Sequence, residues 1–159
     1  MEKISTNPEE LYQIIIKISV YECIAHLQLN LKRRSIVTNV SERAHSLFKK
    51  LLDSFSVNII WGIIYSSIKS TSDYILKHKG TYKSRNESYL ATVLYNKIES
   101  FAERALINNW DLTAFKRDFD LPQSSISRLV FNTILKTDDG GFTQKINSLL
   151  AIDQTSKNC

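Results

Sequence analysis

The stretch NPEELYQIIIKISVYECIAHLQLNL, residues 7–31, decides the fold class of this chain. It opens with Asn7 as a capping residue and Pro8 at the first helical position, followed by two glutamates that favour the positive end of a helix dipole. The apolar run after them contains no turn signal and is too long for a single strand, although residues 14–16 by themselves have β character. Because the apolar positions form a broad stripe, the stretch predicts one long, largely buried helix. These positions are Leu11, Ile14, Ile15, Ile18, Tyr21, Cys23, Ala25 and Leu29.

The composition of the whole chain also favours helices. The sequence has 159 residues, of which 43% are hydrophobic and 23% charged, as is usual for one globular domain with a core of its own. Its four Gly and two Pro are too few for the many turns of an all-β sandwich or for a Gly-rich phosphate loop. We therefore predict an all-α fold: a single compact bundle of six or seven helices over residues 1–153, followed by a disordered tail, residues 154–159.

Apolar residues at spacings of three and four predict further helices downstream. We expect a second helix capped by Ser41 and a third that begins near Val57, in which Gly62 marks close packing against another helix. A fourth should open with a capping box at Ser84, and a short last helix should follow the turn at residues 138–141.

The sequence carries no targeting, membrane or disulfide signal. Its N-terminus is polar and acidic, whereas a signal peptide is basic and then apolar. The longest apolar runs are interrupted by Lys17, Glu22 and Asn58, so none reads as a membrane span. The two cysteines, Cys23 in an apolar run and Cys159 at the end, have no spacing typical of a disulfide framework or a metal site. We expect a soluble, cytoplasmic protein without membrane contact, metal or cofactor.

No catalytic constellation is evident in the sequence. The histidines His26, His45 and His78 fall within expected helices or at a helix end and lack a ligand spacing such as HExxH. His26 follows Cys23 by three residues, which we interpret as two core residues and not as a base with its nucleophile. The chain contains no nucleophile elbow, P-loop or dinucleotide-binding fingerprint. We therefore do not expect an enzyme.

The charge of the chain is compatible with an acidic partner. The net charge is +5 and the pI about 9.2, a balance that bears on association and not on fold. Two basic segments could hold phosphates without reading sequence, in a manner that weakens steeply with salt; each could equally be a solvated face. Tyr82 and Tyr89 near the second segment could stack on bases or simply pack. The first segment contains Lys32, Arg33, Arg34, Arg43, Lys49 and Lys50, and the second contains Lys69, Lys77, Lys79, Lys83 and Arg85.

Residues 111–136, DLTAFKRDFDLPQSSISRLVFNTILK, form the candidate functional surface. They suggest two short helices joined by a tight turn, with Pro122 opening the second. Over residues 112–133 the apolar spacing resembles the helix-turn-helix of many bacterial DNA-binding proteins, and PQSSISRL resembles their recognition-helix openings. The expected inward residues are Phe115, Phe119, Leu121, Ile126 and Leu129.

The resemblance implies that the second helix lies in the major groove and touches base edges with its N-terminal residues. Lys116 and Arg117 would then reach phosphates. The chain departs from the family at two positions: Lys116 stands where a small residue lets the helices approach, and Asp120 stands where Gly is usual in the turn. An ordinary pair of packed helices is the alternative. The residues implied to face DNA are Gln123, Ser124, Ser125, Ser127 and Arg128.

These observations support two functional hypotheses. The first is a small basic nucleic-acid-binding protein, such as a DNA-binding regulator or accessory factor, acting as a homodimer because natural sites are commonly paired. The alternative is a protein–protein interaction module (an inhibitor, adaptor or scaffold) that binds no nucleic acid. Its motivation is the set of seven Tyr, seven Phe and two Trp without a catalytic constellation, because aromatic residues dominate interface hot spots.

Overall fold

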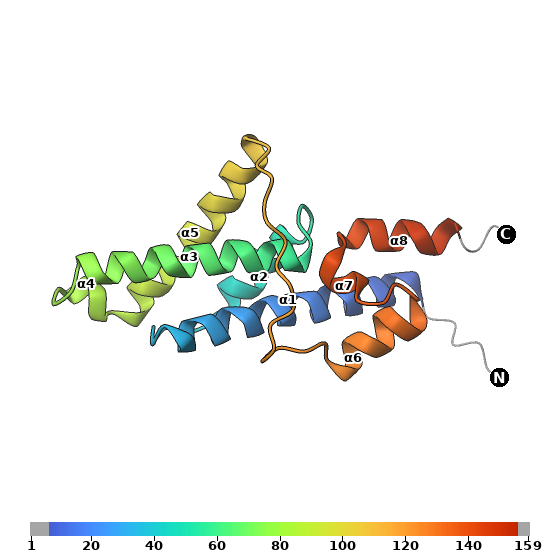
Figure 1. Cartoon of the computed structure of the whole chain (residues 1–159), viewed down its shortest axis with the longest axis horizontal. Helices are drawn as coiled ribbons and strands as arrows, with labels where there is room; N and C mark the ends of the chain where they lie inside the picture. The colour runs from blue at the N-terminus through green and yellow to red at the C-terminus, as the bar shows by residue number, and fades with distance from the viewer. Residues whose placement is uncertain (1–6, 156–159) are drawn as a thin grey trace.

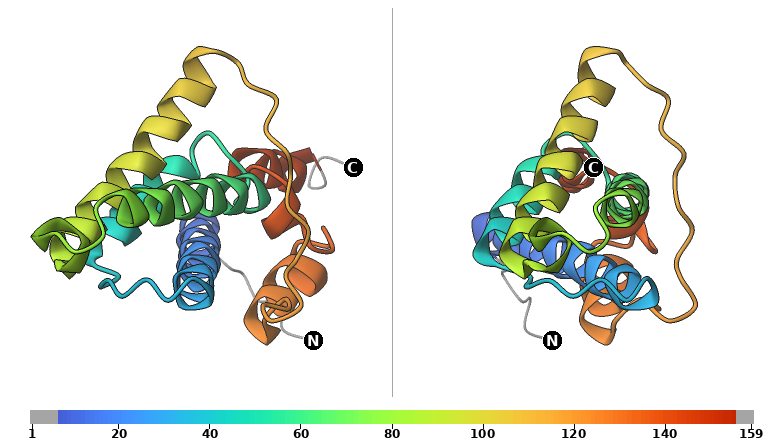
Figure 2. Two further views of the ribbon diagram at one scale, coloured as in Figure 1. Left: turned by 60° about the vertical axis from the view of Figure 1, so that its left-hand side comes forward. Right: turned by 90° about the vertical axis from the view of Figure 1, so that its left-hand side faces the viewer.

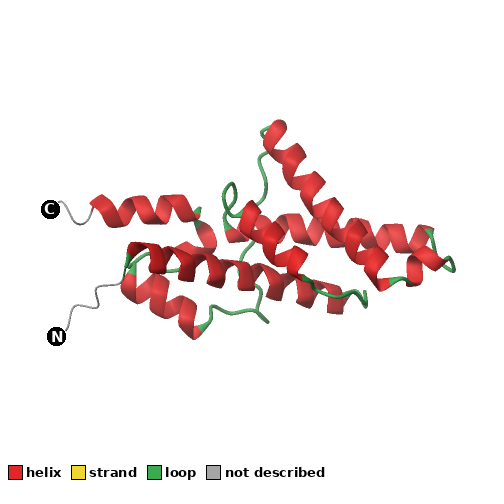
Figure 3. Cartoon of the chain, turned by 180° about the vertical axis from the view of Figure 1, so that it is seen from behind, coloured by secondary structure: helices red, strands yellow, loops and turns green. Residues whose placement is uncertain are grey.

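The computed structural model describes the backbone of residues 7–155 and the side chains to residue 150, and the regular secondary structure of this part consists of helices alone, without a strand (Figures 1 and 3). The predicted all-α fold is confirmed. More helical segments are present than expected, because several are single turns. They are α1 (Pro8–Arg33), α2 (Glu42–Leu51), α3 (Val57–Lys77), α4 (Tyr82–Arg85), α5 (Glu87–Ile107), α6 (Ser125–Ser127), the π-helical η1 (Arg128–Ile134), α7 (Gly140–Thr143) and α8 (Ile146–Thr155).

Helix α1 begins as its sequence predicts. The Asn7 side chain accepts a hydrogen bond from the Glu9 amide at 3.1 Å, and Pro8 occupies the first helical position. The helix continues slightly beyond the expected end at residue 31, to Arg33, with basic residues in its last turn. It lies beside α3 along the long axis of the molecule (Figure 1).

Among the helices of residues 7–155, α1 alone has the length and apolar composition needed to cross a membrane. Its most apolar window has a mean hydropathy of 1.3, so Lys17 and Glu22 interrupt the run less than the sequence suggests. In this structure 56% of that window is buried inside the fold. Packing against the other helices therefore accounts for the apolar character of α1.

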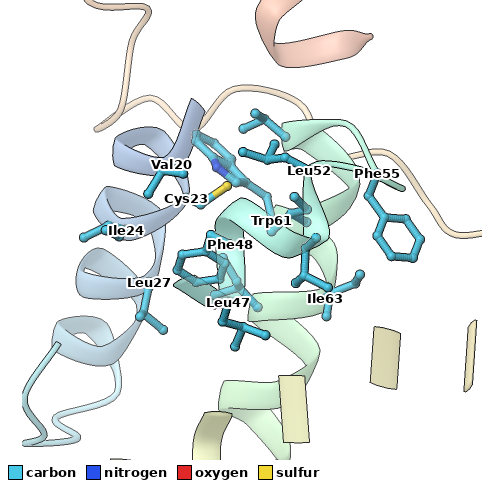
Figure 4. Close-up of a cluster of buried hydrophobic side chains, with 14 of the residues drawn as sticks. Val20, Cys23, Ile24, Leu27, Leu47, Phe48, Leu52, Phe55, Trp61 and Ile63 are labelled. Atoms are coloured by element: carbon cyan, nitrogen blue, oxygen red, sulfur yellow. The ribbon is translucent and has the colours of Figure 1, made fainter. Parts of the chain in front are cut away.

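The core forms where α1, α2 and α3 meet. Figure 4 shows Cys23 and Leu27 of α1 facing Phe48 of α2 and Trp61 of α3. Phe48 and Trp61 are 0% and 1% exposed, and removing an aromatic side chain of this kind from a core typically costs about 3–5 kcal/mol. The thiol of Cys23 is free and buried, as expected of a small core residue.

Helix α5 packs on α3 with its first half and then rises away from the bundle (Figure 2). It opens at Asn86, whose side chain accepts from the Tyr89 amide at 2.9 Å. The capping box predicted at Ser84 is therefore wrong, because Ser84 lies within the preceding single turn, α4. Tyr95 anchors the packed half of α5: its hydroxyl donates to the Asn39 carbonyl at 3.2 Å, which ties α5 to the loop before α2.

The helix expected to begin at Asp111 is absent. Residues 108–124 run as irregular chain from the far end of α5, across the opposite side of α3, to the C-terminal end of α1 (Figure 2). We call this segment the strap. At Phe115 its backbone bonds to α3, since the Phe115 amide donates to the Asn58 carbonyl at 3.2 Å. Tertiary contacts of this kind override a weak local helix preference, and Pro122 disfavours helix in the residue before it.

Gly62 marks close packing, as predicted, but against the strap and not against a helix. A Cβ atom at Gly62 would lie 3.2 Å from the Thr113 carbonyl oxygen and 3.4 Å from the Phe115 ring. The C-terminal part folds back beside α1 as α7 and α8. Helix α8 extends to Thr155, and the remaining residues of the expected tail, 156–159, lie outside the described residues.

Candidate functional site

The second helix of the expected pair forms, but its buried face differs from the one predicted. It runs from Ser125 to Ile134 as α6 and η1, and its side chains Val130 and Phe131 are buried. Ile126 and Leu129, predicted to point inward, are instead 63% and 56% exposed. Without a preceding helix to pack against, this helix turns a different face toward the core. The structure therefore does not confirm a helix-turn-helix pair.

The five residues implied to read bases have different surroundings. Ser127 is fully buried, so solvent and DNA cannot reach it. The Ser124 hydroxyl caps the helix by accepting from the Ser127 amide at 3.1 Å. The Gln123 amide donates to Asn132 at 2.9 Å. Ser125 and Arg128 are exposed, and they are the two candidates whose side chains form no hydrogen bond within the described residues.

Arg117 does not face solvent, as phosphate contact would require. Its side chain is 17% exposed, donates to Asp139, and pairs with Glu22 of α1 at 3.0 Å. Its guanidinium also lies 4.4 Å from the centre of the Phe142 ring. Burial raises the pKa of Glu22 and the charge of Arg117 opposes that rise. The cluster therefore joins the strap to α1 and α7.

Arg33, the last residue of α1, is engaged in the same way by the strap residues that follow Arg117. It donates to both Asp118 oxygens and, at 2.7 Å, to Asp120. The bond from Arg33 holds the pKa of Asp118 at about 2. Of the neighbouring cations, Arg34 lies over the Tyr65 ring at 5.5 Å, while Lys32 and Lys116 are exposed. Intramolecular contacts therefore occupy much of this expected phosphate surface.

The second basic segment has a different environment. Residues 77–85, which we call the basic turn, comprise the end of α3, a loop and α4, at one extreme of the molecule (Figure 1). They include no carboxylate, and none of their cations forms an ion pair within the described part of the chain. Their four cations are all exposed: Lys77, Lys79, Lys83 and Arg85.

An aromatic residue stands among these cations. The Tyr82 side chain is 77% exposed, and its hydroxyl accepts from the Asn86 amide at 2.6 Å, which fixes its direction. Tyr89 is only partly buried, and its hydroxyl lies 3.0 Å from that of Tyr74. The Lys83 ammonium lies 6.0 Å from the Tyr89 ring centre. Of the two tyrosines named from sequence, Tyr82 is therefore the one available for stacking.

A cavity of about 380 Å³ lies between α1 and the end of the strap. Ile18 and Ala25 of α1 line it on one side and Leu121 and Pro122 on the other, and Trp61 also contributes to its wall. The indole nitrogen of Trp61 is buried without a hydrogen-bond partner. Within the described residues, no three His, Cys, Asp or Glu side chains lie close enough to hold a metal ion.

Sequence reasoning missed two features of this region. Arg117 donates to both Glu22 and Asp139, which are far from it and from each other in the chain, so no local pattern signals this cluster. Phe119, predicted to point inward, is 98% exposed. A local signal for its exposure does exist, since Asp118 and Asp120 flank it. Comparisons with known proteins supply no guide to either feature, because no family model, curated protein or solved structure matches this chain.

Proposed function

We propose that this chain is a small helical nucleic-acid-binding protein that holds phosphates with its basic turn. The observation that carries the proposal is that the cations of residues 77–85 are exposed and form no ion pair within the described part of the chain, whereas Arg33 and Arg117 are bound to carboxylates. Cations without an internal partner are available to displace the counterions of a phosphate backbone. The basic turn therefore replaces residues 123–128 as the proposed contact surface.

The basic turn suits a single strand better than a duplex. Tyr82 projects among the cations, and its ring can stack on a base that is not already paired and stacked. Such stacking contributes about 1–3 kcal/mol per base and tolerates any sequence, because every base has a π face. We therefore propose binding without sequence reading, with a preference for unpaired DNA or RNA.

The test is the salt dependence of binding to random-sequence oligonucleotides, single-stranded and duplex, measured by fluorescence anisotropy. Four phosphate contacts predict a log–log slope of about −2.8 on single strands and about −3.6 on duplex. Replacing the four cations of the basic turn by Gln should bring the slope close to zero. Tyr82→Ala should weaken single-strand binding while leaving the slope unchanged, because it removes stacking and no charge.

A matched control removes the same charge elsewhere. Lys32, Lys49, Lys116 and Lys145 are exposed and lie outside the basic turn, so replacing these four by Gln lowers the net charge equally. This control should retain most of the slope. If it loses as much binding as the basic-turn variant, attraction is diffuse and the basic turn is not the site. Absence of binding by the wild-type chain even at low salt contradicts the proposal outright.

The interaction-module function is a second candidate, and a specific observation favours it. Ile126, Leu129 and Phe119 were expected in the core, and all three are exposed. Large exposed apolar side chains are typical of protein interfaces. A protein partner would cover these side chains, and its binding should be insensitive to salt.

A further inference from the structure

The tip of the strap presents an aromatic side chain on a rigid turn. Phe119 is 98% exposed, while the carboxylates on both sides of it, Asp118 and Asp120, are bound by Arg33. The Leu121 amide donates to the Asp118 carbonyl at 3.0 Å, and the Asp120 amide donates to the Asp118 side chain at 3.0 Å. The backbone of the turn is therefore held in place, with Phe119 directed away from its own chain. An apolar ring fixed in water in this way has the properties of an interface anchor.

The cavity beside this turn has the properties of a receptor for such an anchor. Its volume is about 380 Å³, and its lining is mostly apolar. Two of its lining residues, Leu121 and Pro122, follow Phe119 closely in the chain, yet Phe119 does not contribute to it. Tyr21 and Ile126 also line the cavity and are 64% and 63% exposed.

Further apolar side chains extend the surface around the cavity. Ile14 precedes Ile18 by four residues on α1 and is 40% exposed. Leu129 follows Ile126 by three residues on the other wall and is 56% exposed. Residues at these spacings lie on the same face of a helix. We call the cavity together with Ile14, Tyr21, Ile126 and Leu129 the apolar face.

The charges around anchor and receptor are complementary. At the turn that carries Phe119, Asp118 and Asp120 share the single guanidinium of Arg33, so this contact does not neutralise both carboxylates. Next to Tyr21, on the side toward α2, a groove is lined by Lys17 and Lys49. Both lysines are exposed, and neither forms an ion pair within the described part of the chain. The carboxylates of a turn that entered the cavity could reach the cations of this neighbouring groove, which shares Tyr21 with the cavity.

We propose that a second copy of this chain covers the apolar face, with Phe119 of each copy inserted into the cavity of the other. Anchor and receptor belong to the same chain and lie only a few residues apart, so one two-fold axis can satisfy both pairs at once. Within one copy neither is satisfied, because the turn directs Phe119 away from its own cavity. The proposal is independent of nucleic-acid binding, which uses residues at the other extreme of the molecule.

The first experiment measures the dimer dissociation constant of the full chain by sedimentation velocity over a dilution series. Phe119→Ala removes both anchors of the dimer and should raise this constant about a hundredfold or more. Ile126→Glu places a charge at both cavity mouths and should leave a monomer. Tyr82→Ala is the matched control, because it removes another exposed aromatic side chain that lies outside the apolar face, and it should leave the dimer dissociation constant unchanged.

A mixing experiment tests reciprocal insertion itself. In a mixture of the Phe119→Ala and Ile126→Glu chains, the second chain still carries its anchor and the first still carries an open cavity. One of the two insertions can therefore form, and the mixture should contain heterodimers that neither variant forms with itself. The thermal unfolding temperature of each variant serves as the check of folding, and we expect it to stay near that of the wild type because both side chains are exposed.

Three results would overturn the proposal. The wild-type chain could be monomeric at every soluble concentration, in which case the face binds something else or nothing. The dimer could survive Phe119→Ala unchanged, which would place the interface elsewhere. Finally, both variants could be monomeric with no heterodimer on mixing, which would exclude insertion of Phe119 into the cavity of the partner copy.

Discussion

The basic turn and the strap contain similar residues in opposite situations. Each combines cations with an exposed aromatic side chain, Tyr82 in one case and Phe119 in the other. The cations of the basic turn form no ion pair within the described part of the chain, whereas Arg33 and Arg117 are bound to carboxylates that attach the strap to the bundle. The same residue type therefore serves as a tether in one region and is available to a ligand in the other. Counting basic residues does not distinguish these roles.

The largest loss of stability should come from removing the buried ion pair between Arg117 and Glu22, which attaches the strap to α1. Arg117→Met leaves the Glu22 carboxylate without its cation, and both side chains are less than a fifth exposed, at 17% and 13%. We expect the free energy of unfolding to fall by about 3 kcal/mol, measured by urea denaturation. The double variant Glu22→Gln with Arg117→Met should recover part of this loss. If Lys83→Met in the basic turn destabilises the protein as much, the contrast between the two regions is wrong.

A buried histidine should make stability depend on mildly acidic pH. His26 lies stacked on Trp61 with ring centres 4.2 Å apart, and burial lowers its pKa to about 4, with Asp118 opposing and Arg33 favouring that shift. The unfolded chain therefore binds a proton near pH 6.5 that the folded chain accepts only near pH 4, so stability falls as pH falls between these values. We expect a loss of about 2 kcal/mol between pH 7 and pH 5.

The control for this prediction is His26→Phe, which keeps an aromatic ring against Trp61 and removes the titrating group. Urea denaturation at a series of pH values should show the loss for the wild type and a nearly flat profile for this variant over the same window. An equal slope in both chains would assign the pH dependence to other groups.

A smaller window, at lower pH and of the same sign, belongs to Asp118. Its pKa is lowered from 3.8 to about 2 by Arg33, so the contact stabilises the folded chain above pH 4 and is lost as pH falls through about 2. Because Arg33 is 42% exposed, solvent screening keeps the contribution of this contact small. The difference in unfolding free energy between wild type and Asp118→Asn should disappear below pH 2 and at high salt. A difference that persists there would contradict an ionic origin.

The smallest effect on stability should come from the basic turn. Lys83→Gln removes an exposed cation without an ion pair, and we expect a change in unfolding free energy within about 0.5 kcal/mol. On duplex DNA the same substitution should reduce the salt slope by about 0.9, the contribution of one phosphate contact. A clear loss of stability with an unchanged slope would mean that Lys83 is structural and not a binding residue.

Local patterns predicted the long helices well, and the reason is visible in particular residues. The start of α1 is defined by Asn7 and Pro8, and its length by an apolar run without turn signals. The third predicted helix, α3, begins at Val57 and ends with basic residues and Gly80, as its sequence indicates. In both cases the structure depends on hydrogen bonds and caps formed within a few residues, which the sequence displays directly.

The strap and the surfaces on either side of it were not predictable in the same way. Helical spacing in residues 111–121 is present, but Phe115 bonds to α3 and Arg117 pairs with α1, and these contacts outweigh a weak preference for helix. Because the first helix of the expected pair does not form, the second helix exposes Ile126 and Leu129 to solvent. No local signal indicates which of these arrangements is formed.

The sequence by itself determined an all-α chain, the course of its long helices and the presence of two basic segments. Only the tertiary structure decided which cations have partners, which aromatic side chains are exposed, and that a cavity lies beside Phe119. The physical reason is range: helices depend on interactions between residues three and four apart, whereas ion pairs such as Glu22–Arg117 depend on segments brought together by folding.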